Sequence, residues 1–343
     1  MRPLVIELLL GFGCAALYWW EIECAGLIQA MAPTGFVVGP VDRMALQTEF
    51  ASQMLLIIFM LAATLVDIDE QTIPDLITVP GTLLGLLVAA VWPRSLLPYV
   101  APAAVVPAVE FLTLSSPAAW PARLAPFPNG LSLIVGLLCF IAWCAALLPL
   151  RRHTRHGWIR ALRLLAARWI NDPLSTIVLG ITAAGSVGVV AAWWVGGDTW
   201  RGLLSALVGM AAGGALIWAV RIAAGWALGR EAMGFGDVTL MAMIGSYLGW
   251  QTGPLVFFLA PLAGLVVGLI QWFLYRDNVI PYGPFLCLAA LTVIVAWGPL
   301  WVWVEPFYEI QWLVPGAMLA CLMLLAVLLG AWRALRSVTQ RRR

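Results

Sequence analysis

Long apolar segments recur along the whole chain, each close to the length that crosses a lipid bilayer. A membrane-spanning helix needs roughly 20 apolar residues. A weaker apolar run at 96–114 is interrupted by Pro98, Pro102 and Pro107, which predicts a re-entrant or extracytoplasmic segment. We therefore expect an all-α, polytopic membrane bundle of about ten transmembrane helices. The predicted spans are 4–20, 51–66, 76–92, 130–150, 174–196, 203–222, 238–250, 254–274, 284–304 and 312–332.

The composition supports a membrane protein and narrows its chemistry. Hydrophobic residues make up 63% and charged residues 10% of the 343 residues, and the mean hydropathy is +0.96. Soluble domains carry roughly 25% charged residues. The net charge of +2 gives no indication of nucleic acid as a partner, and the absence of lysine excludes Schiff-base catalysis. The six cysteines form no C-x-x-C pair, so we predict no metal site, no disulfide framework and no cofactor.

The arginines orient the predicted spans. If the chain starts inside, the inner loops hold 15 of the 19 arginines, and the outer segments hold only Arg43, Arg94, Arg123 and Arg201. Cytoplasmic loops carry an excess of basic residues. Both termini are therefore expected in the cytoplasm, on the same side as segments 67–75 and 223–237.

Acidic residues stand at two places where one predicted span ends and the next begins. One segment runs from Asp67 to Asp75, and the other is Gly234-Phe235-Gly236-Asp237. Carboxylates at membrane helix ends are costly and point to function. Two close carboxyl groups share a proton, so one can activate water while the other donates to a carbonyl. We expect Asp67 and Asp237 to form this pair, with Gly234 and Gly236 allowing a sharp turn and close approach of a peptide strand.

These motifs resemble the two signatures of the type IV prepilin peptidases, which are membrane aspartic proteases of the GxGD type. The resemblance covers roughly 51–92 and 203–305, including Pro281-Tyr282-Gly283-Pro284-Phe285. It implies that Asp67 and Asp237 are catalytic, and that Asp69, Pro74 and Asp75 are support or substrate-contact positions. The implied reaction removes the basic leader of type IV prepilins or type II secretion pseudopilins, at the cytoplasmic side of the bacterial inner membrane.

The chain departs from the family pattern in three ways. Residues 1–50 lack the cysteine-rich zinc segment of the bifunctional members, so N-methyltransferase activity is not expected. Thr239 stands where a basic residue often follows the second aspartate. The two aspartates are 170 residues apart, and most of the excess falls in 93–202. That region holds an arginine-rich segment at 151–169, which is expected to lie as an amphipathic helix on the inner leaflet.

This pattern divides the chain into five regions. Residues 1–50 hold the first span and an outer loop, 51–92 the first aspartate helix pair, and 93–202 the inserted region. Residues 203–305 hold the second aspartate segment, and 306–343 the last span and a basic tail. Two other functions remain open. A proton- or cation-coupled transporter would need carboxylates near mid-membrane in several spans. A non-catalytic assembly scaffold of the same fold is the other, and Thr239 in place of a basic residue is the observation that suggests it. The sequence leaves the oligomeric state open.

Overall fold

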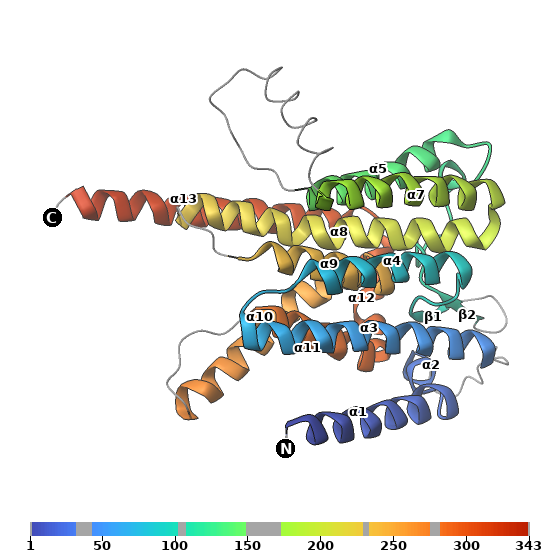
Figure 1. Cartoon of the computed structure of the whole chain (residues 1–343), viewed down its shortest axis with the longest axis horizontal. Helices are drawn as coiled ribbons and strands as arrows, with labels where there is room; N and C mark the ends of the chain where they lie inside the picture. Colours follow the sequence, from blue (N-terminus) through green and yellow to red (C-terminus); the bar gives the residue numbers. More distant parts are fainter. Residues whose placement is uncertain are drawn as a thin grey trace.

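The computed structural model describes residues 2–31, 43–101, 108–148, 173–228, 233–274 and 282–341. Long helices lie side by side in a bundle (Figure 1). The N-terminal elements are α1 (Arg2–Tyr18), the π-helix η1 (Trp19–Glu23), α2 (Gly26–Met31), α3 (Arg43–Glu70) and α4 (Asp75–Val91). Next come β1 (Pro98–Ala101), β2 (Ala108–Phe111), the 3-10 helix η2 (Ala122–Leu124), α5 (Gly130–Leu147), α7 (Pro173–Val195) and α8 (Gly197–Leu228). The C-terminal elements are α9 (Phe235–Leu248), α10 (Thr252–Leu274), α11 (Gly283–Val295), α12 (Trp297–Glu309) and α13 (Leu313–Arg341).

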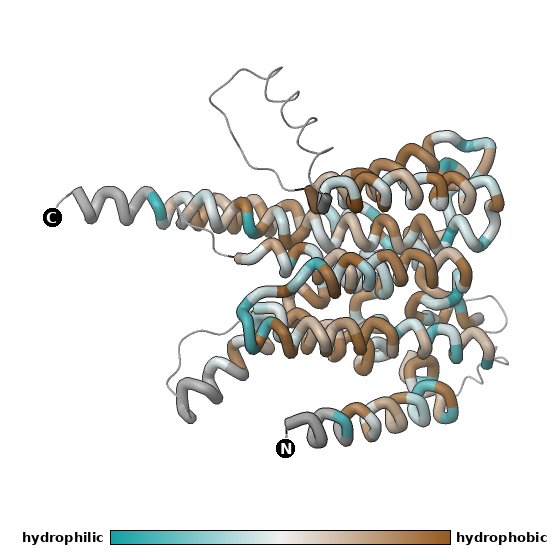
Figure 2. Tube along the Cα trace, viewed as in Figure 1, coloured by the Kyte–Doolittle hydropathy of each residue, from teal (hydrophilic) through white to brown (hydrophobic). Residues whose placement is uncertain are grey.

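The bundle exposes apolar side chains on its outer surface. Within the described ranges, α3, α5, α7, α8 and α13 are long and apolar enough to cross a membrane, and α11 with α12 makes a sixth span if the bent pair is counted as one. Leu138, Val187 and Leu324 are each more than half exposed, as expected of side chains that face lipid. Figure 2 shows hydrophilic residues gathered at the α3–α4 turn, at one end of the bundle. The all-α polytopic architecture is confirmed, but the predicted count of ten spans is not.

The predicted span 284–304 is not one straight helix. α11 and α12 meet at an angle of 90°, with Ala296 between them. The turn buries Trp297 and Trp301 completely, and the Trp297 indole N–H donates to the Pro98 carbonyl oxygen at 2.7 Å. Apolar length gives no indication of such a bend, because the hydropathy of the segment is the same whether it runs straight or turns to bury its aromatic side chains.

The weaker apolar run at 96–114 forms a β-hairpin instead of a helix. β1 and β2 pair antiparallel, with Pro98 opposite Phe111 and Ala101 opposite Ala108. The hairpin lies at the end of the bundle opposite to the α3–α4 turn (Figure 1). Its non-helical character agrees with the proline-based reading, and its location relative to a membrane stays a prediction.

α9 is the central helix of the bundle, held between α4 and α8. A side chain at Gly209 of α8 would collide with the Gly245 carbonyl of α9, and one at Gly245 would collide with the Gly209 carbonyl. Glycines at such crossings let helix backbones touch in lipid. On the α4 side, the Tyr247 hydroxyl donates to the Gly81 carbonyl oxygen at 2.9 Å, and Met243 lies against Gly81. These contacts fix α9, which has Asp237 in its first turn.

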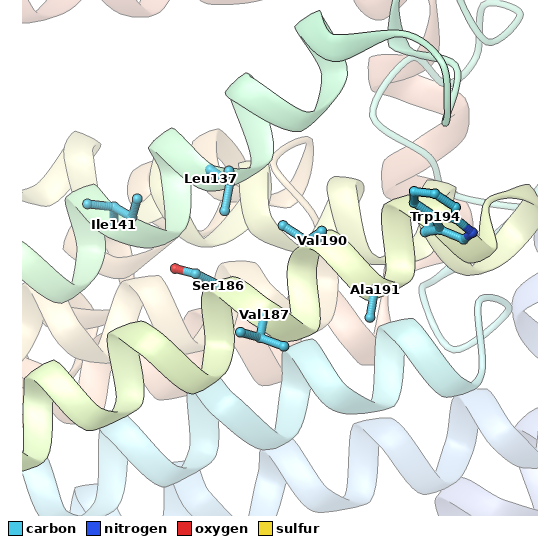
Figure 3. Close-up of a pocket in the computed structure, with 7 residues that line it drawn as sticks. All are labelled: Leu137, Ile141, Ser186, Val187, Val190, Ala191 and Trp194. Carbon is cyan, nitrogen blue, oxygen red and sulfur yellow. The ribbon is translucent and has the colours of Figure 1, made fainter.

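The inserted region packs on the outside of this core. α5 and α7 lie together against α8 (Figure 1), and the Phe140 ring sits over Gly185. Figure 3 shows a pocket between α5 and α7 lined mostly by apolar side chains, among them Leu137, Val190 and Trp194. None of its lining residues belongs to the helices that carry the aspartate motifs. The predicted amphipathic helix at 151–169 lies outside the described residues.

Candidate active site

The two aspartate motifs lie at the same end of the bundle, although 170 residues separate them in the sequence. Asp67 lies near the end of α3, Asp75 begins α4 and Asp237 lies in the first turn of α9. Figure 1 shows the α3–α4 turn beside the start of α9, with the start of α1 and the end of α13 pointing toward the same end. α3 packs against both α9 and α11. The negative charge of Asp67 acts directly on Asp237, so the two carboxyl groups share one environment.

The α3–α4 turn is shaped by Gln71 and Pro74. Gln71 adopts a left-handed φ of 55°, and its N–H donates to the Asp67 carbonyl oxygen at 2.9 Å, which closes the last turn of α3. Pro74 is extended (φ −75°, ψ 136°) and caps α4, a position where the missing N–H of proline costs nothing. The turn places Ile73 over α9: a Cβ on Gly236 would lie only 2.8 Å from the Ile73 Cβ and 2.9 Å from its carbonyl oxygen. Glycine at 236 therefore lets the two motifs touch.

The glycines before Asp237 do not adopt the positive φ that only glycine reaches easily. Gly234 is extended, with φ −67° and ψ 158°, and the described glycines with positive φ are Gly196, Gly197 and Gly249. Gly236 is required by its contact with Ile73. Among the described residues, a Cβ on Gly234 would lie within 4 Å of only the Asp237 Oδ2 atom and the Gly236 nitrogen, both at 3.9 Å. Gly234 thus lies next to the Asp237 carboxyl group.

Asp67 is buried, and one of its oxygens lacks a partner. Its side chain is 5% exposed, and Oδ2 has no hydrogen-bond partner among the described residues. The carboxyl group lies against Gly283, the first residue of α11, where any Cβ would collide with Oδ2. A buried, unsatisfied carboxylate oxygen costs on the order of 1–3 kcal/mol or more. This oxygen is therefore poised to take a proton or to bind a water molecule.

Asp237 is buried, with 8% of its surface exposed, and lies in the first turn of α9. Burial, followed by the negative charge of Asp67, raises the pKa of Asp237 from 3.8 to about 7. The Gly234 backbone N–H and the positive charge of Arg221 lower this pKa in part. Near neutral pH, Asp237 therefore keeps its proton in about half of the molecules. A carboxyl group in this state can act as a general acid.

Arg221 of α8 holds the segment that precedes Asp237. Its Nε atom donates to the Met233 carbonyl oxygen at 3.1 Å, and its guanidinium lies 5.7 Å from the centre of the Phe235 ring. Arg221 was not predicted as a site residue. Its position within the predicted span 203–222 was an available signal, because a charged side chain within a membrane helix is costly and points to function.

Thr239 links α9 to α4. Its hydroxyl donates to the Gly236 carbonyl oxygen and accepts from the Thr78 hydroxyl, both at 3.0 Å, and both threonine side chains are fully buried. The Asp75 carboxylate also reaches the Thr239 hydroxyl. Threonine, where the family often has a basic residue, therefore forms a neutral hydrogen-bonded bridge that fixes the start of α9.

The other predicted positions surround the pair without joining it. Asp69 and Asp75 are exposed at the end of α3 and the start of α4. Asp69 is two positions from Asp67 on a helix, so its side chain points toward a different face. Gly283 belongs to the segment that resembles the peptidase family, but the resemblance gave this glycine no role. Its contact with Asp67 is evident only in the structure.

Comparisons with known proteins agree with these motifs. The model of the type IV leader peptidase family matches residues 165–269, which include Asp237 but not Asp67. A prepilin leader peptidase/N-methyltransferase of Aeromonas salmonicida strain A449 is 35% identical over 96 residues, covering 27% of this chain and 33% of the relative. Proteins of the same name from Pectobacterium carotovorum and Pseudomonas putida are 38% identical over 96 residues and 31% identical over 148 residues.

The matches cover part of each protein. The Pectobacterium alignment covers 27% of this chain and 34% of the relative, and the Pseudomonas alignment covers 41% and 51%. The chain thus spans about a third to a half of the length of these curated relatives. No solved structure matches the chain. The resemblance to the type IV leader peptidases is confirmed over residues 165–269, which match the model of that family and hold the second aspartate motif.

Proposed function

We propose that this protein is a membrane aspartic endopeptidase that removes the basic leader of type IV prepilins or pseudopilins. The observation that carries this proposal is the meeting of Asp67 and Asp237 at one end of the bundle, where both are buried and the charge of one acts on the other. The names of the relatives supply the substrate class. We place this end of the bundle at the cytoplasmic face, because most arginines of the chain lie in the loops predicted on that side.

The proposed mechanism divides acid and base work between the two carboxyl groups. Asp67, with its unpartnered Oδ2, takes a proton from a water molecule, and the water oxygen bonds to the carbonyl carbon of the scissile peptide. Asp237, protonated near neutral pH, donates its proton to the carbonyl oxygen. The C–N bond then breaks, the leaving nitrogen receives the proton that Asp67 took from water, and one hydroxyl of the intermediate returns its proton to Asp237 as the carboxylic acid forms. This sharing of one proton by two carboxyl groups is the logic of aspartic proteases.

The surroundings of the pair suit a substrate with a basic leader and an apolar helix. Asp69 and Asp75 are exposed carboxylates at the same end as the pair, so they attract a basic peptide. Gly234 adds no side chain next to Asp237, which favours the approach of an extended substrate strand. The apolar helix of the substrate remains in the lipid beside the bundle while the leader crosses the site.

The proposal is tested with the purified full chain in detergent and a synthetic peptide that has an arginine- and lysine-rich leader ahead of an apolar segment. Mass spectrometry of the products reports both the cleavage position and any methylation. Asp67→Asn and Asp237→Asn should each lower kcat by at least about 10³-fold. The matched control Asp69→Asn should keep kcat within a few-fold and raise KM. Peptide binding by the wild type without cleavage, or cleavage by either asparagine variant at the wild-type rate, would refute the proposal and favour the scaffold function.

A further inference from the structure

A second group of buried polar side chains lies at the other end of α3. Glu21 of η1 is 3% exposed, and Glu49 and Gln53 of α3 are 1% and 2% exposed. Glu49 precedes Asp67 by 18 residues on the same helix, a separation of about 27 Å at 1.5 Å per residue. These side chains therefore form a group separate from the aspartate pair. Figure 1 shows α2 and the β-hairpin beside this end of α3, and Ile22 and Leu46 pack there with Ile28 of α2.

The backbone around Glu21 is irregular. η1 is a π-helix, and the Cys24 N–H donates to the Trp19 carbonyl oxygen, five residues earlier, at 3.0 Å. Ala25 follows in a left-handed conformation with φ 46°. The Tyr18 ring packs edge-on against Phe50 of α3, with ring centres 5.3 Å apart. These features hold η1 against α3 with the Glu21 side chain buried, and π-helical turns of this kind are frequent at functional sites.

Several oxygens of this group lack a donor. Gln53 Nε2 donates to Glu49 Oε1 at 2.6 Å. Glu21 Oε1, Glu21 Oε2 and Gln53 Oε1 are buried and have no hydrogen-bond partner within the described part of the chain. The charge of Glu21 also acts on Glu49, so the two carboxyl groups are close together. Arg43 is exposed and engaged with Glu23 at 3.8 Å on the surface.

We propose that Glu21, Glu49 and Gln53 bind one divalent cation of the calcium class. Every unsatisfied atom is an oxygen, the ligand type that Ca²⁺ prefers over nitrogen or sulfur. Two carboxylates neutralise a double positive charge, and Ca²⁺ tolerates irregular coordination completed by backbone carbonyls or water. The ranges that the structure describes hold no cluster of three or more His, Cys, Asp or Glu side chains fit for a metal. In the proposed site the third ligand is an amide oxygen.

The opposing possibility is a pair of carboxyl groups that simply retain protons. Burial raises the pKa of Glu21 to about 8, so in the absence of a cation its carboxyl group is mostly protonated at neutral pH. A bound cation must displace this proton. Calcium binding should therefore weaken as the pH is lowered. A cation held between η1 and α3 also ties the first helix to the bundle, so binding should stabilise the fold.

Calcium binding is measured by equilibrium dialysis of the full chain in detergent at pH 8, after treatment with a chelator and with radioactive Ca²⁺ as the probe. We expect one ion per chain. Glu21→Gln and Glu49→Gln should each weaken binding at least about tenfold, because each removes a charged ligand. Glu23→Gln is the matched control, since Glu23 is two residues away and exposed, and it should bind as the wild type does.

A second measurement separates loss of the site from loss of the fold. Calcium should raise the melting temperature of the wild type and of Glu23→Gln, whereas Glu21→Gln and Glu49→Gln should unfold at a temperature independent of calcium. If the two carboxyl groups only retain protons, millimolar calcium will neither bind to the wild type nor stabilise it at pH 8. That result would overturn the proposal. Undiminished binding in both Glu21→Gln and Glu49→Gln would overturn it as well.

Discussion

Replacing Asp237 by asparagine should abolish cleavage and stabilise the protein at alkaline pH. Burial of Asp237 makes its ionised form costly, and a pKa raised from 3.8 to about 7 corresponds to about 4 kcal/mol at 1.36 kcal/mol per unit. Because the folded pKa is the higher one, the folded state retains the proton between these values. The favourable contribution is complete below pH 3.8 and is lost as the pH rises through 7. Asparagine has no charge at any of these pH values and escapes this loss.

The expected stability difference grows with pH. Asp237→Asn should exceed the wild type by about 2 kcal/mol at pH 5 and about 4 kcal/mol at pH 8.5, as the linkage relation gives for these two pKa values. The assay is denaturant unfolding in detergent micelles, followed by circular dichroism, at both pH values. Asp69→Asn is the matched control, because Asp69 is exposed, and it should follow the wild type at both. An Asp237→Asn variant less stable than the wild type at pH 8.5, or a difference that does not change with pH, would refute the reasoning.

The same pKa sets the alkaline limit of the proposed reaction. If protonated Asp237 is the general acid, its protonated fraction falls from about 0.9 at pH 6 to about 0.1 at pH 8, given a pKa of about 7. The wild-type cleavage rate should therefore fall about tenfold over this range. A rate that is level or rises between pH 6 and pH 8 would contradict the assignment of Asp237 as the acid.

Three further substitutions test how the site is held. Gly283→Ala puts a methyl group against Asp67 Oδ2, so peptide cleavage should fall at least about tenfold while circular dichroism stays unchanged; full activity would contradict the close contact. Thr239→Val removes two hydrogen bonds and should lower the free energy of unfolding by about 1–2 kcal/mol, and an unchanged value would show that this bridge is dispensable. Gly245→Ala forces α8 and α9 apart and should lower the free energy of unfolding by denaturant by at least about 2 kcal/mol. The control Gly188→Ala, whose added methyl group meets nothing within 4 Å, should lower it by less than about 0.5 kcal/mol. Equal losses would refute the helix crossing.

The sequence predicted the elements that depend on local composition. Apolar length located the helical regions because the bilayer requires backbone hydrogen bonds to be satisfied within each segment. The joint occurrence of two aspartate motifs at span ends predicted that Asp67 and Asp237 come together, and the structure brings their carboxyl groups into one environment.

Features that depend on packing between remote segments were missed. The bend at Ala296 buries Trp297 against the Pro98 carbonyl oxygen, a contact between residues 199 positions apart. Gly236 is needed for its contact with Ile73, a residue remote in the sequence, and the motif itself gives no sign of that contact. The sequence predicts a re-entrant or extracytoplasmic segment at 96–114 but not its hairpin, because alternation over two four-residue strands is too short to detect.

The central claim is that Asp67 and Asp237 act as one catalytic unit. A double-mutant cycle of Asp67→Asn, Asp237→Asn and the combined variant, measured as kcat for cleavage of the leader peptide, tests it most directly. Residues that act together lose their full effect when either is removed, so the double variant should retain the same residual rate as each single variant. Losses that multiply in the double variant would show that the two aspartates contribute independently, and would contradict the account.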